Sequence, residues 1–167
     1  MQNTKFFSIL SLLFFLSACG SSSEVAYEGI KYPQTNNVQV GFQENNIPDD
    51  CSAFAHLLLN TKTNSNGKEI ANIIQKEAKA KGANRILIGM SREVIEEELE
   101  ANRFDYYGPE YSYIFNRTWL GWKFGFDEWN DGDTLVGLGT HVWGDSSIIF
   151  RSTLLVQAVF LRCGDDN

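Results

Sequence analysis

The chain has 167 residues and 43% hydrophobic content, which favours one globular domain once a targeting segment is set aside. It carries 14 Lys and Arg against 21 Asp and Glu, a formal net charge of −7 at pH 7. This balance argues against a nucleic-acid partner and against docking on anionic lipid through a basic patch.

Residues 1–18 have the composition of a bacterial signal peptide. Lys5 supplies a positive charge, and residues 6–16 form an apolar run interrupted by two serines. The run is shorter than the roughly 20 apolar residues of a permanent transmembrane helix, but it suits a signal sequence. It ends in Leu16-Ser17-Ala18-Cys19, which resembles the lipobox of bacterial lipoproteins.

The lipobox resemblance implies a lipid anchor on Cys19. Its thiol would take a diacylglyceryl group, and cleavage before it would remove one Lys and no acid, so the formal charge would change from −7 to −8. Acyl chains such as palmitate contribute about 0.8 kcal/mol per buried methylene, so two or more hold a protein on a bilayer. Gly20 stands where an Asp would direct retention in the inner membrane, which favours the periplasmic side of the outer membrane. Apart from this covalent lipid, no cofactor is expected.

Two further cysteines, Cys51 and Cys163, lie 112 residues apart. An even pair in an exported protein is usually a disulfide, and closing a loop of this length would stabilise the fold by about 4–5 kcal/mol on the chain-entropy model. The alternatives are two free thiols or a metal pair. His56 and His141 are too distant in sequence to give a zinc spacing, so a disulfide is predicted.

Residues 19–37 contain the lipidated Cys and a Ser-rich tether, and residues 38–167 are expected to form a single α+β domain. A strand over residues 25–32 that packs on the domain is the alternative for part of the tether. Residues 38–43 alternate between apolar and polar side chains, which predicts a strand. Residues 53–60 are mostly apolar and predict a buried strand.

The clearest element is a helix over residues 67–81. Asn66-Gly67-Lys68-Glu69 has the form of a capping box, and apolar residues then recur at helical spacing from Ile70 to Ala78. Gly82 suits the left-handed position that ends a helix.

Two segments, residues 85–90 and 152–163, are apolar on both faces of a strand. Such strands lie in the middle of a sheet, because both of their faces are covered. The fold class is therefore α+β, with a small sheet covered by one main helix.

An aromatic-rich insertion is predicted between these strands, over about residues 91–147. Residues 92–103 are rich in Glu and suggest a helix, whereas residues 104–143 hold most of the aromatic side chains and have the turns of antiparallel hairpins. Aromatic residues are enriched at interaction surfaces, but they also build small cores. The candidate interaction surface comprises Tyr111, Tyr113, Trp119, Trp122 and Trp129.

The order of these elements resembles the small lipoprotein fold of the envelope-stress sensor RcsF and of the YbjQ-type proteins. The matching residues are 38–42, Cys51, Ala78-Lys79-Ala80-Lys81-Gly82-Ala83-Asn84 and Leu161-Arg162-Cys163. The resemblance covers about half of the chain after the signal peptide and implies a fold and an envelope location. The sensor has four cysteines and no comparable aromatic insertion, so its partners are not carried over.

No catalytic or metal-binding pattern is evident. The acidic run from Asp127 to Asp133 lacks calcium ligands at two required positions, because Trp129 and Leu138 stand there. His56 and His141 have no nucleophile beside them in sequence. The expected function is therefore that of a non-enzymatic, membrane-anchored envelope lipoprotein that contacts other envelope proteins. The alternative is an accessory lipoprotein that binds glycan or another small ligand through its aromatic insertion.

Overall fold

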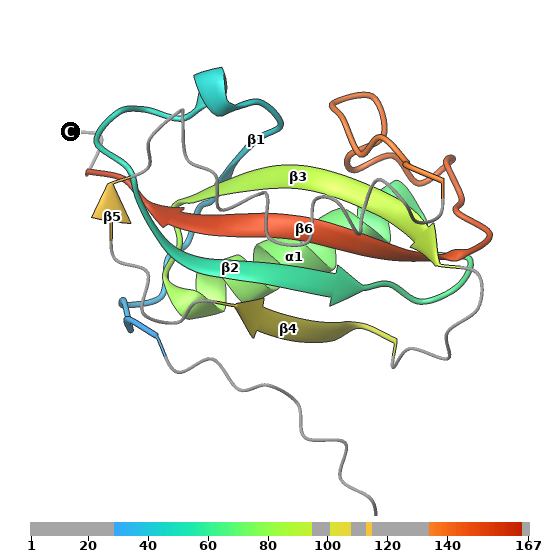
Figure 1. Ribbon diagram of the computed structural model, residues 1–167, viewed down its shortest axis with the longest axis horizontal. Helices are drawn as coiled ribbons and strands as arrows, with labels where there is room; N and C mark the ends of the chain where they lie inside the picture. The colour runs from blue at the N-terminus through green and yellow to red at the C-terminus, as the bar shows by residue number, and fades with distance from the viewer. Residues whose placement is uncertain (1–28, 95–100, 108–112, 115–133, 165–167) are drawn as a thin grey trace, which may run out of the picture.

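The computed structural model describes residues 29–94, 101–107, 113–114 and 134–164, which form a small α+β fold with a mixed sheet and one α-helix (Figure 1). The elements, in chain order, are β1 (Gln39–Gly41), the 3-10 turn η1 (Glu44–Asn46), β2 (Ser52–Asn60), α1 (Gly67–Lys81), β3 (Arg85–Val94), β4 (Arg103–Tyr107), β5 (Tyr113–Ile114) and β6 (Thr153–Arg162). No helix in these ranges is long and apolar enough to cross a membrane.

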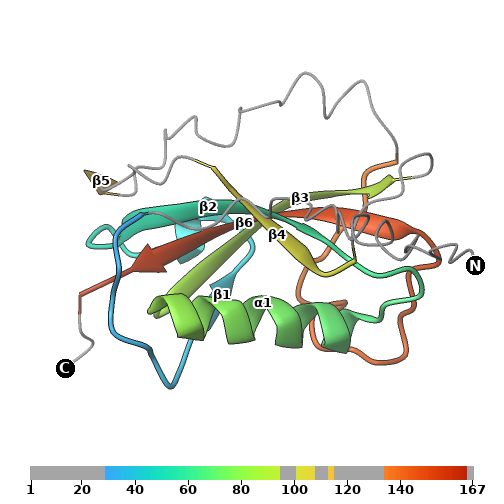
Figure 2. The same cartoon turned by 90° about the horizontal axis from the view of Figure 1, so that it is seen from below.

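The strands are ordered β1-β3-β6-β2-β4, and β5 adds a short pairing to the start of β2. β1 runs parallel to β3, and the other pairs are antiparallel. α1 lies across one face of this sheet (Figure 2). The two segments that were predicted to be apolar on both faces, β3 and β6, are interior strands, which confirms that part of the prediction.

α1 begins and ends where the sequence predicts. The Asn66 Oδ1 atom accepts a hydrogen bond from the Glu69 N–H group at 2.9 Å, and Glu69 Oε2 accepts one from the Asn66 N–H group at 3.1 Å. Gly82 ends the helix with φ of 85°. The capping box and the left-handed glycine satisfy backbone groups that the helix itself leaves unpaired.

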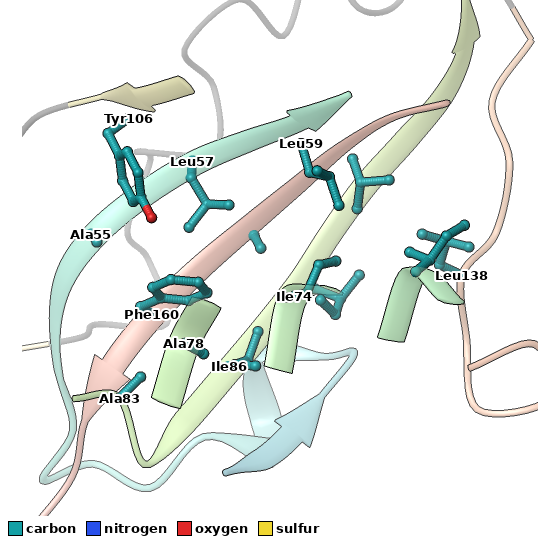
Figure 3. Packing of buried hydrophobic residues seen from close by; sticks show 14 of the residues in the cluster. Ala55, Leu57, Leu59, Ile74, Ala78, Ala83, Ile86, Tyr106, Leu138 and Phe160 are labelled. Carbon is teal, nitrogen blue, oxygen red and sulfur yellow. The ribbon is translucent and has the colours of Figure 1, made fainter. Parts of the chain in front are cut away.

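The main core lies between α1 and the sheet (Figure 3). The helix contributes Ile70, Ile74 and Ala78, which are fully buried against side chains such as Leu57 and Phe160 from the strands. Each large side chain buried in this way contributes roughly 1.5–3 kcal/mol. The helix is thus held mainly by its apolar face.

The described part of the predicted tether packs on this domain. Ile30 and Tyr32 lie against the core, and the Tyr32 ring meets Phe54 edge-on with 4.9 Å between centroids. Thr35 donates its backbone N–H group to the Lys79 carbonyl at 3.1 Å. Residues of the predicted tether from Ile30 to Thr35 therefore contact the domain. Residues 29–32 form no strand, although a strand over 25–32 was the alternative.

The boundaries predicted for the insertion are wrong. β3 continues to Val94 after a bulge between Ile88 and Ser91, so residues 92–94 are strand and not helix. β4 belongs to the main sheet, because residues 103–107 pair with β2. The bulge shifts the side-chain alternation by one residue, so the second half of β3 does not continue the strand pattern of the first half in the sequence.

Residues 134–150 also belong to the main domain. Glu93 donates its N–H group to the Thr134 carbonyl at 2.9 Å, and Leu138 is buried in the core cluster. The N–H group of Gly67, at the start of α1, bonds to the Ile148 carbonyl at 3.2 Å. Residues 134–150 therefore pack against the N-terminal end of α1. Most of them were predicted to lie in the insertion instead.

Candidate functional site

A disulfide joins Cys51 to Cys163, as the sequence predicts, with an S–S distance of 1.98 Å. The bond lies in a second apolar cluster, on the sheet face opposite α1, together with Leu87, Val159 and Leu161. The Asn84 side chain fixes the backbone beside it. Its Nδ2 atom donates to the Cys163 carbonyl at 3.0 Å, and its Oδ1 atom accepts from the Cys163 N–H group at 2.9 Å.

The same face of the sheet carries a group of polar residues, here called the polar row. Register places them together. Leu58 is opposite Gln157 and Asp105, Asn60 is opposite Leu155 and Arg103, and Leu155 is opposite Arg92. Residues paired across strands share a face, and alternate residues of one strand do the same. The polar row therefore consists of His56, Asn60, Arg92, Arg103, Asp105 and Gln157.

Two buried carbonyl oxygens in the polar row are unpaired. Asn60 is 4% exposed and Gln157 is 3% exposed. Neither Asn60 Oδ1 nor Gln157 Oε1 accepts a hydrogen bond from any part of the chain that the structure describes. A buried acceptor without a partner costs roughly 1–3 kcal/mol, so each of these two oxygens lowers the stability of the fold.

His56 is the third buried member of the row. Burial lowers the pKa of its imidazole to about 4, so the ring is neutral near pH 7. A neutral imidazole donates through one nitrogen and accepts through the other. With this pKa the imidazole is a weak base at neutral pH, so it does not suit general-base catalysis there.

The Arg103 and Asp105 side chains form an ion pair at the β4 end of the row. Asp105 Oδ1 lies 2.8 Å from one terminal guanidinium nitrogen and accepts from the Nε–H group at 2.9 Å. The positive charge of Arg103 balances the negative charge of Asp105, so this end of the polar row has no net negative charge. Within the described ranges, no three His, Cys, Asp or Glu side chains are grouped so that they would hold a metal ion.

The two histidines considered from the sequence do not form one site. His56 faces the polar row, whereas His141 is exposed on a turn. The neighbours of His141, Val142 and Trp143, pack against the core on the helix side.

The predicted aromatic surface is described only at Tyr113, whose backbone in β5 pairs with Ala53. Cys19, Tyr111, Trp119, Trp122 and Trp129 lie outside the described residues. The lipidation site and the aromatic surface therefore stay predictions.

Sequence reasoning missed the polar row. Gln157 interrupts an otherwise apolar strand that is covered on both sides, and that single amide was the available signal. Asn60 ends β2, as the predicted strand over residues 53–60 indicates, but the sequence does not show which face its side chain lies on. Arg92 was assigned to a helix. A side chain's face is unknown until strand register is known.

Comparison with protein-family models, with curated proteins and with solved structures finds no match for this chain.

Proposed function

We propose that this protein is a lipid-anchored bacterial envelope protein that acts by binding and not by catalysis. The observation that carries the proposal is the disulfide between Cys51 and Cys163. Structural disulfides persist in oxidising compartments such as the periplasm and are rare in the cytosol. The bond thus agrees with the export that the first nineteen residues predict.

The anchor in this proposal is a diacylglyceryl group on Cys19, and the favoured location is the periplasmic side of the outer membrane. Ten residues, 20–29, separate Cys19 from Ile30, which packs on the core. Ten residues reach at most about 35 Å when fully extended. The domain would therefore act close to the membrane surface.

We further propose that partner contact involves Tyr111, Tyr113, Trp119, Trp122 and Trp129, from the aromatic-rich region predicted over residues 104–143. Their partners would be other envelope proteins. The resemblance to RcsF and YbjQ-type proteins supports the fold and location, but it assigns no partner.

Crosslinking in whole cells tests this proposal. The chain with Trp119→Ala, Trp122→Ala and Trp129→Ala is expected to lose its crosslinked partners while it keeps the disulfide, as shown by gel mobility without reductant. A matched control is Lys62→Ala, because Lys62 is exposed in the loop between β2 and α1. Unchanged crosslinking in the triple variant would reject the aromatic contact surface.

The alternative proposal is an accessory lipoprotein that binds glycan on the same tryptophans, since aromatic rings stack on sugars. Tryptophan emission is expected to respond to cell-wall oligosaccharides under this alternative. Emission that stays constant over a full titration would count against it.

A further inference from the structure

A groove of about 440 Å³ lies along the outer side of α1, next to the N-terminal segment that packs on the helix. It is lined by Gln34, Asn72, Gln75, Lys76, Lys79 and Ala80. The helical members are spaced by three or four residues, so they form one stripe along the helix. Ile70, Ile74 and Ala78 occupy the other side of α1 and are buried in the core. Figure 2 shows this outer side of α1 facing away from the sheet.

The groove is cationic although the protein is acidic. Its lining holds two lysines and no carboxylate, in a chain with 21 acidic and 14 basic residues. The two acidic residues of α1 are used elsewhere. Glu69 belongs to the capping box, and Glu77 accepts a hydrogen bond from the Tyr106 hydroxyl group and lies 3.5 Å from the Lys81 ammonium group.

Neither Lys76 nor Lys79 forms an ion pair with a residue in the described ranges. Their ammonium groups are therefore available to an external anion. A lysine ammonium presents a compact positive charge with three donors, which suits carboxylates and phosphates.

One wall of the groove is the segment around Gln34 and the other is α1, and hydrogen bonds join the two. The Thr35 N–H group donates to the Lys79 carbonyl at 3.1 Å, and the Thr35 hydroxyl donates to the Ala83 carbonyl. Arg162 donates to the Gly82 carbonyl at 3.2 Å, so the end of the helix beside this wall is also fixed. A site that is formed before the ligand arrives loses less entropy on binding.

The other lining residues suit a ligand that carries hydroxyl groups in addition to a negative charge. Gln34, Asn72 and Gln75 each offer an amide that donates and accepts hydrogen bonds, which matches neighbouring hydroxyl groups. Ala80 and the methylene stems of the two lysines give an apolar floor that suits the C–H face of a sugar ring. We propose that this groove binds an anionic carbohydrate, either as a free sugar or as one unit of a longer glycan. The proposal uses neither the lipid anchor nor the aromatic residues.

Isothermal titration of the full chain with defined sugars tests the proposal. The probes are glucuronic acid and glucose 6-phosphate, with glucose and inorganic phosphate as controls for the ring and for the charge. Both anionic sugars are expected to bind with saturation and more tightly than either control. A glucuronate-containing tetrasaccharide distinguishes a free sugar from a unit of a longer glycan. If the tetrasaccharide binds more tightly than glucuronic acid, the ligand is a glycan unit, and if the two bind equally, it is a free sugar.

Variants locate the binding. Lys76→Gln with Lys79→Gln is expected to weaken binding of both anionic sugars by about tenfold or more, since the loss of about 1.4 kcal/mol of interaction already weakens binding tenfold. Gln34→Ala, on the opposite wall, should weaken it by a smaller factor. Lys68→Gln is the matched control, because Lys68 is exposed on the same helix but does not line the groove. Absence of saturable binding, equal binding of a control probe, or unchanged affinity in the double variant would overturn the proposal.

Discussion

Replacement of Gln157 by Met tests whether the polar row is maintained at a cost to stability. Gln157 is 3% exposed, and its Oε1 atom has no hydrogen-bond partner in the described part of the chain. Met has nearly the same length and volume but no polar atom that requires a partner, so packing changes little. A buried acceptor that has no partner destabilises the folded state by roughly 1–3 kcal/mol, so its removal should stabilise the folded state by a similar amount. Gln157→Met should therefore raise the free energy of unfolding by about 1 kcal/mol or more.

Urea denaturation of the oxidised chain, followed by circular dichroism, measures this change. The midpoint should move to higher urea concentration with an unchanged slope, since the area exposed on unfolding is the same. Leu58→Met is the matched control, because Leu58 lies opposite Gln157 in the same face and is already apolar. A loss of 1 kcal/mol or more in Gln157→Met would show that the amide has a partner in the folded chain and would refute the reasoning.

Three further changes should affect stability in different ways. Reduction of the disulfide should lower the free energy of unfolding by about 2–5 kcal/mol, measured by urea denaturation with and without reductant, and no change would show that the bond does not constrain the unfolded chain. Burial lowers the pKa of His56 from 6.5 to about 4, so its neutral form contributes stability above pH 6.5 that is lost as pH falls towards 4. Melting curves over this range should be less pH-dependent in His56→Gln and unchanged in the exposed His141→Gln, and equal pH dependence in all three proteins would contradict this. A Cβ atom at Gly67 would lie 2.0 Å from the Val142 carbonyl oxygen, whereas one at Gly139 would meet nothing within 4 Å. Gly67→Ala should lose about 1–3 kcal/mol in thermal denaturation and Gly139→Ala much less, and equal melting temperatures would be the contrary result.

Local chemistry explains which elements were predictable. The bounds of α1 follow from the Asn66 capping box and from Gly82, and both signals act within a few residues of the helix ends. β6 was found because its apolar side chains occur on both faces over ten residues. The disulfide followed from the number of cysteines and from the export signal, without knowledge of the fold.

The missed features depend on contacts that are distant in sequence. The bulge in β3 inverts the side-chain alternation before Ser91. Residues 91–94 therefore have the sequence pattern of neither a regular strand nor a good helix. β4 became recognisable only through its pairing with β2. The polar row exists because four strands each bring one or two polar residues to one face, and no local pattern encodes that register.

Mass spectrometry of the protein purified from membranes, both intact and after proteolysis without reductant, tests the central proposal most directly. The intact mass is expected to match a chain that begins at Cys19 and carries a diacylglyceryl group there, and the digest is expected to contain a peptide pair linked through Cys51 and Cys163. A chain that begins at Met1 with an unmodified Cys19 would contradict the proposed lipid anchor.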